Sequence, residues 1–257
     1  MSDHLSGKGV LITGGSRGIG AATAARLAAR GASIYLAAND SAERFDAVID
    51  ECRRCARDGS AIFAYGEHDL ARQGAPEAMV EAAAQALGRI DALVNNAAIR
   101  IRHPFGEFSY DDFEQMIGIN LRAALFASQA VLPYMRRAGG GRIVHVASQM
   151  GQIAETGSTL YGLTKAALIH LTKSMAFELA PENIIVNAVS PGPTMTEYNE
   201  ARTRADPSLL ARKLSYVPAR RYARPDEIAE VIEFLLTTRA TILQGHDLVV
   251  DGGYTIH

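Results

Sequence analysis

Short apolar segments alternate with longer stretches of helical period along the whole chain of 257 residues. Segments such as Val10-Leu11-Ile12 are apolar at every position. Uninterrupted apolar segments are typical of strands buried on both faces, and their alternation with helices indicates a parallel sheet. We therefore predict an α/β fold in which seven parallel strands form a doubly wound sheet with helices on both faces.

The expected elements fill the chain. The strands are expected at 10–13, 33–38, 61–65, 91–95, 142–147, 184–189 and 247–250. The helices are expected at 18–30, 42–57, 76–87, 110–137, 159–179 and 226–237. Because no linker or repeat is evident, residues 1–257 are expected to form a single domain.

One segment, 190–224, differs from the rest because prolines at 191, 193, 207 and 218 interrupt any long element. It follows the sixth strand at the edge where open α/β sheets bind ligands. Long connections of this kind are often functional. We predict that it is a substrate lid.

The charge balance and the hydropathy pattern argue against several classes of protein. Lys and Arg number 26 against 28 Asp and Glu, so the net charge of −2 shows no basic excess for nucleic acid. No segment reaches the ~18 consecutive apolar residues of a membrane helix, and the first nine residues lack a secretory pattern. We expect a cytoplasmic protein without nucleic-acid or membrane partners.

Two cysteines, Cys52 and Cys55, have the Cys-Arg-Arg-Cys spacing of some redox and zinc sites. A structural zinc needs about four ligands, and the next histidine is His68. A redox pair has its low thiolate pKa at a helix N-terminus, whereas this pair comes late in an expected helix. We interpret both as ordinary helix residues and expect no metal site.

A glycine-rich turn, Thr-Gly-Gly-Ser-Arg-Gly-Ile-Gly at residues 13–20, ends the first strand and leads into a helix. Glycines there allow a tight turn and a close approach to a pyrophosphate, which the helix N-terminus stabilises. A flexible glycine loop is the alternative. The order of strand, turn and helix favours a dinucleotide site in a Rossmann-type sheet.

The pattern Thr-Gly-x-x-x-Gly-x-Gly resembles that of the short-chain dehydrogenase/reductase family. Further family motifs follow in order: Asn95-Asn96-Ala97-Ala98, Asn120, Ser148, Tyr161 with Lys165, Pro191-Gly192 and Asp251-Gly252-Gly253. The likeness runs from residue 8 to residue 253, with Ala98 in place of the family's usual glycine. It implies an enzyme that moves a hydride between NAD(P) and a carbonyl or secondary alcohol.

The resemblance implies four catalytic residues, namely Asn120, Ser148, Tyr161 and Lys165. Tyr161 and Lys165 are four positions apart, so they share one face of a helix. A nearby ammonium favours the anion of a phenol, which lets Tyr161 act as general acid or base. Ser148 can donate a hydrogen bond to the substrate oxygen, and the resemblance has Asn120 anchor a water beside Lys165. Each residue alone has an ordinary structural explanation; their order favours an enzyme.

Cofactor contacts also follow from the resemblance. They are expected from Gly14, Ser16, Arg17, Gly18, Ile19, Gly20, Asn39, Asp69, Leu70, Asn96, Ala97, Tyr161, Lys165, Pro191, Gly192 and Thr194. Ala38 ends the second strand where NAD-using members usually carry an acidic residue, and Arg17 can pair with a 2′-phosphate. Asp40 would repel that phosphate if its side chain pointed inward. On balance NADP(H) is favoured and NAD(H) stays possible.

Substrate contacts are expected from Ser148, Tyr161 and the loop between them, which contributes Gln149, Met150, Ala154, Glu155 and Ser158. Arg100, Arg102 and His103 follow the Asn-Asn-Ala-Ala motif and are compatible with an anionic substrate. Solvation or subunit contacts are the commoner explanation of such charges.

Three functions stay open. The glycine motif and Ala38 favour a 3-oxoacyl reductase. A reductase whose substrate is carried by acyl carrier protein needs a basic face on which that protein docks. Arg136, Arg137 and Arg142 offer some positive charge, but Glu178 and Glu182 weaken it. The weak docking face favours an NAD-dependent sugar or polyol dehydrogenase. A non-catalytic NAD(P)-binding scaffold would lack Tyr161 or Lys165, and both are present. Family resemblance implies a homotetramer or homodimer, paired through the helices at 110–137 and 159–179.

Overall fold

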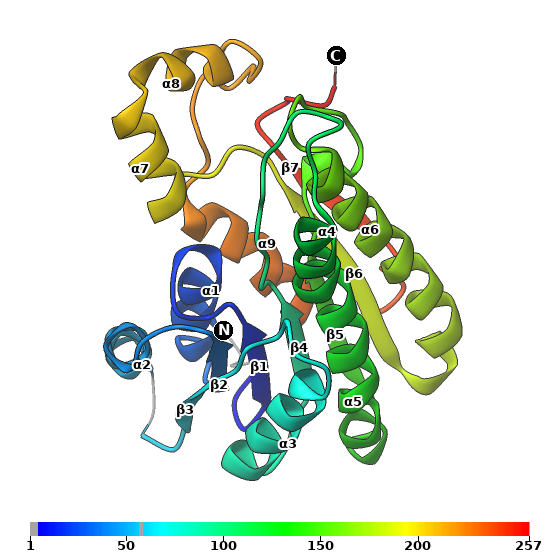
Figure 1. Cartoon of the computed structure of the whole chain (residues 1–257). Coiled ribbons are helices and arrows are strands. Elements are labelled where there is room, and N and C mark those ends of the chain that lie inside the picture. The colour runs from blue at the N-terminus through cyan, green and yellow to red at the C-terminus, as the bar shows by residue number, and fades with distance from the viewer. Residues whose placement is uncertain (1–4, 57–58, 257) are drawn as a thin grey trace.

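The computed structural model describes residues 5–56 and 59–256, and within them seven parallel strands form one sheet in the order β3-β2-β1-β4-β5-β6-β7 (Figure 1). The strands are β1 (Gly9–Thr13), β2 (Ser33–Ala38), β3 (Phe63–Glu67), β4 (Ala92–Asn95), β5 (Gly141–Val146), β6 (Ile184–Pro191) and β7 (Asp247–Val250). The longer helices are α1 (Gly18–Ala28), α2 (Ala42–Cys55), α3 (Ala75–Leu87), α4 (Tyr110–Ile117), α5 (Ala123–Arg137), α6 (Thr159–Leu179), α7 (Glu197–Ala205), α8 (Pro207–Leu214) and α9 (Pro225–Thr237). The predicted doubly wound α/β sheet is confirmed.

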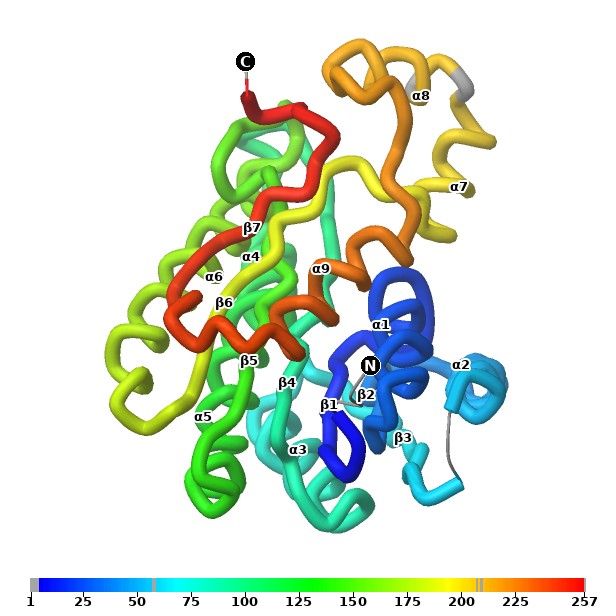
Figure 2. Tube along the Cα trace, turned by 180° about the vertical axis from the view of Figure 1, so that it is seen from behind, coloured from blue at the N-terminus to red at the C-terminus, as the bar shows by residue number. Residues whose placement is uncertain are grey.

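Helices cover both faces of the sheet, which explains why its inner strands are apolar throughout. Seen from opposite sides, α3, α5 and α6 lie on one face and α1 and α9 on the other (Figures 1 and 2). Val10 and Ile12 belong to the core under α1 and α9, whereas Leu11 between them belongs to the core under α3 and α5. Successive side chains of a strand point to opposite faces, so a strand covered twice needs an apolar residue at every position.

The order of the strands also locates the site. The chain winds outward from β1 to β3 and then returns to place β4 beside β1. At such a reversal the connections leave the two strands in opposite directions, and a crevice forms outside their carboxyl ends.

The helix predicted at 110–137 is divided. A π-helical turn, Gly118–Arg122, separates α4 from α5. A single wider turn does not end the helix, so the apolar period continues through it and gives no sign of it in the sequence. β3 lies two residues later than predicted, because the bounds of this edge strand depend on its pairing with β2.

Among the described residues, one stretch, Tyr110–Arg137, is long and apolar enough to cross a membrane by length and composition alone. Ala127, Val131 and Met135 from this stretch are buried in the core against the sheet. Their burial accounts for its apolar character within the fold.

Cys52 of α2 is fully buried in the core, and Cys55 at the end of the same helix is partly exposed. Burial raises the pKa of the Cys52 thiol to about 12. Such a thiol is not reactive, in keeping with an ordinary helix residue.

The segment predicted as a lid contains the two short helices α7 and α8, which project beyond the sheet (Figures 1 and 2). The Asp206 carboxylate accepts a hydrogen bond from the Ser208 backbone nitrogen at 3.0 Å and so caps α8. The function of this segment as a lid stays a prediction.

Candidate active site

A cavity of about 890 Å³ lies at the carboxyl ends of the central strands, between the glycine-rich turn and the start of α6. Most of the residues predicted to contact cofactor or substrate line it: Gly14, Ser16, Arg17, Gly18, Ile19, Asn39, Asp69, Leu70, Asn96, Ala97, Ser148, Gln149, Met150, Glu155, Tyr161, Lys165, Pro191, Gly192 and Thr194. Gly20, Asn120, Ala154 and Ser158 are not among its described lining residues.

The glycine-rich turn has the conformation that a dinucleotide site requires. Gly14 and Gly18 have φ of +64° and +56°, in the left-handed region that favours glycine. Asn96 Nδ2 donates to the carbonyls of Thr13 and Gly14 at 2.9 Å each, and a Cβ on Gly14 would lie 2.8 Å from that nitrogen. Asn96 thus holds the turn, and the N-terminus of α1 borders the cavity at Gly18, where it suits a pyrophosphate.

Tyr161, Lys165 and Ser148 lie together at the other end of the cavity. Tyr161 and Lys165 are one turn apart on α6, and Lys165 Nζ is 5.7 Å from the centre of the Tyr161 ring. The Ser148 side chain is hydrogen-bonded to Tyr161. Ser148 Oγ also accepts from the Met150 backbone nitrogen at 3.2 Å, which orients the hydroxyl.

Burial changes the ionisation of both residues of α6. Lys165 is 2% exposed, its Nζ donates to the Val146 carbonyl at 2.7 Å, and burial lowers the pKa of its ammonium to about 7. Burial raises the pKa of Tyr161, while the positive charge of Arg100 and the hydrogen bond with Ser148 act against this rise. A contribution of Lys165 to lowering the Tyr161 pKa stays a prediction.

Asn120 lies in the π-helical turn behind the cavity. Its Nδ2 donates to the Ile99 carbonyl at 2.9 Å and to Thr164 Oγ1 at 3.1 Å, and its Oδ1 accepts from the Ile99 backbone nitrogen at 2.8 Å. Thr164 Oγ1 in turn donates to the Tyr161 carbonyl at 2.8 Å. The amide therefore ties the segment after β4 to the first turn of α6, and its role in a water relay stays a prediction.

Asp40, at the end of the cavity beside α2, points toward Ser16 and two arginines. Ser16 Oγ donates to its carboxylate at 2.9 Å, Arg44 Nε lies at 3.4 Å and Arg17 Nε at 3.9 Å. Although burial opposes ionisation, the hydrogen bonds from Ser16 and Ser41 and the two guanidinium groups hold the pKa of Asp40 below its usual value. The inward direction of Asp40, which the sequence left open, is therefore observed.

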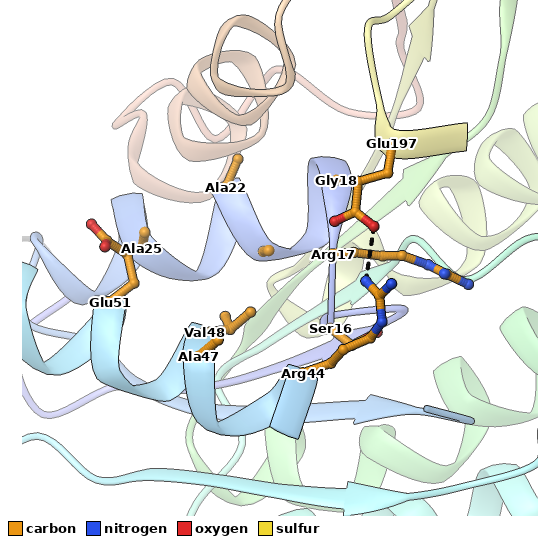
Figure 3. Close-up of a pocket in the computed structure, with 11 residues that line it drawn as sticks. Ser16, Arg17, Gly18, Ala22, Ala25, Arg44, Ala47, Val48, Glu51 and Glu197 are labelled. Atoms are coloured by element: carbon orange, nitrogen blue, oxygen red, sulfur yellow. Dashed lines mark hydrogen bonds and ion pairs between the residues drawn. The ribbon is translucent and has the colours of Figure 1, made fainter. Parts of the chain in front are cut away.

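A second cavity of about 350 Å³ adjoins this end, between α1, α2 and the first turn of α7 (Figure 3). Arg44 of α2 donates to the Glu197 carboxylate of α7 at 2.8 Å, so the two helices are joined here. Neither residue is predicted from the sequence. The one sequence signal is the position of Arg44, four residues after Asp40 at the start of a helix, which indicates an ion pair between these two residues.

Known proteins resemble this chain over its whole length. A family model described as enoyl-(acyl carrier protein) reductase matches residues 14–255. The 3-oxoacyl-[acyl-carrier-protein] reductase of Thermotoga maritima is 34% identical over 98% of this chain and 100% of its own length. The D-threitol dehydrogenase of Mycolicibacterium smegmatis is 36% identical over 98% of this chain and 95% of its own. A short-chain dehydrogenase of Burkholderia cenocepacia, solved with NADP, superposes with a TM-score of 0.89 at 35% identity, over 98% of this chain and 99% of that one.

The chain belongs to the short-chain dehydrogenase/reductase family. It is accordingly an NAD(P)-dependent oxidoreductase, and the resemblance drawn from its motifs is confirmed.

The Tyr161 end of the cavity in this short-chain dehydrogenase/reductase holds a network of ion pairs that the sequence does not predict. Glu155 is ion-paired with Arg102 at 2.5 Å, with Arg100 at 3.2 Å and with Lys213 of α8. Arg100 Nη2 also donates to Ser158 Oγ at 2.6 Å. Lys213 is 58 residues from Glu155 along the chain, so no local signal could have revealed this contact.

The remaining predicted residue, His103, lies apart from this group. Its Nε2 is 3.6 Å from the Asp112 carboxylate, and its ring packs edge-on against Phe108. The segment 190–224, predicted to be a lid, instead contributes Tyr198 and Arg202 of α7 to the cavity lining.

Proposed function

We propose that this protein interconverts a carbonyl group and a secondary alcohol with NADP(H), and that Tyr161 is its general acid and base. The observation that carries the proposal is the grouping of Tyr161, Ser148 and Lys165 in the same cavity as the glycine-rich turn. When bound there, the nicotinamide supplies or accepts the hydride at the substrate carbon. Gly14, Gly18 and the N-terminus of α1 would hold the pyrophosphate.

Each catalytic side chain has one task in this proposal. The Ser148 hydroxyl donates a hydrogen bond to the substrate oxygen, where negative charge develops during reduction. The Tyr161 phenol gives its proton to that oxygen, and the phenolate takes it back in the reverse reaction. The Lys165 ammonium stabilises the phenolate. Asn120 holds the first turn of α6 through Thr164 and supports the return of a proton from solvent.

Replacing Tyr161 tests the proposal. Tyr161→Phe keeps the ring but removes the proton, so we expect turnover to fall by about 100-fold or more while cofactor still binds. Tyr110→Phe is the control, because Tyr110 is 90% exposed and is not among the described residues that line the cavity. Steady-state kinetics over a panel of ketones measures the turnover of each variant, and a separate titration measures its cofactor binding. A folded Tyr161→Phe protein with near-normal turnover contradicts the proposal.

NADP(H) is favoured because Arg17 is available to a 2′-phosphate. Its side chain is 58% exposed, and its contact with Asp40 at 3.9 Å is loose. The Burkholderia cenocepacia relative solved with NADP supports this preference. The inward Asp40 carboxylate instead suits an unphosphorylated ribose, whose hydroxyls it can bind, and this favours the alternative of an NAD-dependent sugar or polyol dehydrogenase. The D-threitol dehydrogenase relative supports the polyol substrate of that alternative.

Titration with NADPH and NADH, followed by the fluorescence of the cofactor, separates the two. We expect NADPH to bind about tenfold more tightly or better, and Arg17→Met to reduce the ratio of the two affinities. Arg53→Met, in an exposed ion pair of α2, should leave that ratio unchanged. Tighter binding of NADH by the wild-type protein would support the alternative.

A further inference from the structure

At the substrate end of the cavity, the positive charges outnumber the negative charges that pair with them. Arg100, Lys213 and Glu155 line it, and Arg102 shares the Glu155 carboxylate. Their side chains are only 17% to 26% exposed. One carboxylate therefore faces three cations that are largely shielded from water.

The network leaves two hydrogen-bond donors unused. The Nε atoms of Arg100 and of Arg102 are buried and have no hydrogen-bond partner among the described residues. Among the described ion pairs, Glu155 is the only acidic partner of Arg100, Arg102 and Lys213. Buried charged donors normally have partners, so the two unused donors show that one carboxylate does not satisfy this group of cations.

The three cations also oppose one another. Burial and the charge of Arg102 lower the pKa of Arg100. Burial likewise lowers the pKa of Lys213, and the charges of Arg100 and Arg102 add to this although Glu155 opposes it. A second anion bound among them would relieve this repulsion.

The excess charge lies beside the proposed proton donor. The guanidinium carbon of Arg100 is 4.9 Å from the centre of the Tyr161 ring. A substrate whose anionic group is bound by Arg100 would therefore have its reacting oxygen, next to Tyr161, only a few bonds away from that group. The glycine-rich turn that suits a pyrophosphate is at the opposite end of the cavity, so cofactor phosphates do not supply this anion.

We propose that Arg100 and Lys213 bind an anionic group of the substrate, so that the enzyme acts on a small oxo or hydroxy compound that bears a carboxylate or phosphate. The identity of the reacting carbon rests on the proposed function, whereas the anion site rests on the charges around Glu155. A neutral polyol would leave these three cations with Glu155 as their one acidic partner among the described ion pairs. An acyl chain on a carrier protein would place its charge on the outer face of the enzyme instead of beside Tyr161.

Calorimetric titration tests the anion site without turnover when the protein is first loaded with the oxidised form of the cofactor that it binds. The oxidised cofactor has no hydride to give, so a ketone binds without being reduced. Acetoacetate is compared with its neutral methyl ester, and dihydroxyacetone phosphate with dihydroxyacetone. We expect at least one anion to bind about tenfold more tightly than its neutral counterpart. The tighter of the two anions shows whether the site suits a carboxylate or a phosphate.

Variants assign the site to these residues. Arg100→Met should reduce the preference for the anion by about tenfold, Lys213→Met should reduce it less, and Arg100→Lys should restore part of it. Arg137→Met, which removes an exposed arginine of α5, is the matched control. Glu155→Gln should strengthen anion binding, because it removes the carboxylate that competes for the same cations. Misfolding cannot produce that increase.

Two outcomes overturn the inference: a wild-type protein that binds neither anion more tightly than its neutral counterpart, or an Arg100→Met protein whose preference is unchanged. Both outcomes are read from binding, so they do not depend on whether Tyr161→Phe loses turnover. The anion site can therefore fail while the proposed function holds, and the converse is also possible.

Discussion

His145 is a neutral histidine inside the sheet. It lies in β5 and is fully buried, with Nδ1 2.9 Å from Thr172 Oγ1 and Nε2 3.4 Å from Ser128 Oγ. Asn95 Nδ2 donates to the same Ser128 oxygen at 2.9 Å. Burial, together with the positive charge of Lys165, lowers the pKa of His145 to about 3. The ring therefore joins β4, α5 and α6 through neutral hydrogen bonds.

This histidine should make the protein sensitive to acid. Its pKa is about 3 in the folded protein, against 6.5 for an exposed histidine, so the unfolded chain binds more protons between these values. The free energy of unfolding therefore rises with pH up to about 6.5 and decreases as the pH falls below it. At pH 5 the loss is about 2 kcal/mol relative to pH 7.5.

Urea unfolding at pH 5 and pH 7.5 measures this effect. His145→Gln should lower stability at pH 7.5, because it disturbs buried hydrogen bonds, but should remove most of the pH-dependent loss. His170→Gln, at an exposed position of α6, is the control and should keep the loss. An unchanged difference between the two pH values in His145→Gln would show that His145 is not its source.

At the scale of elements, the two lid helices are held at opposite ends of the cavity. Glu197 at the start of α7 pairs with Arg44 of α2, and Lys213 of α8 pairs with Glu155. Asn199 Nδ2 also donates to the Thr194 carbonyl at 2.8 Å. A few polar contacts thus position helices that contribute little to the core, and we expect such helices to open without unfolding of the sheet.

Glu197→Gln should loosen α7 selectively. Because the Arg44 pair is exposed and joins two elements, we expect amide hydrogen exchange in 197–205 to become a few-fold faster while the strands are unaffected. Asp50→Asn is the control, because Asp50 pairs with Arg53 within α2 alone. Equal exchange in α7 of the wild-type and Glu197→Gln proteins, measured by mass spectrometry, would contradict the role of this pair.

At the scale of the whole molecule, large apolar side chains are exposed on the helices predicted to pair subunits. Phe113 of α4 and Phe126 of α5 are each 39% exposed, and Phe177 of α6 is 86% exposed. Apolar side chains gathered on neighbouring helices often mark a protein interface. They support the prediction of a homodimer or homotetramer, which stays a prediction.

Light scattering after gel filtration tests this surface. The wild-type protein should have the mass of a dimer or tetramer, and Phe126→Glu combined with Phe177→Glu should reduce it, because two carboxylates would be buried in the interface. Ile62→Glu is the control at a partly exposed residue beside edge strand β3. A monomeric wild-type protein at micromolar concentration would refute the prediction.

Local patterns in the sequence determined the sheet, the glycine-rich turn and the placement of Tyr161 and Lys165 on one helix. Strand and helix periods repeat within a few residues, and the four-residue spacing of Tyr161 and Lys165 places them on one helix face whatever surrounds them. Edge strand β3 was predicted two residues too early, and the π-helical turn at Gly118–Arg122 was not predicted, because neither depends on periodicity alone.

Only the tertiary structure decided how the charges meet. The direction of Asp40, the pairing of Arg44 with Glu197 and the three cations around Glu155 each join residues from different elements. The lowered pKa of Lys165 likewise comes from burial by the whole fold. Coulomb interactions and desolvation depend on distance and exposure in space, which the order of residues along the chain does not contain.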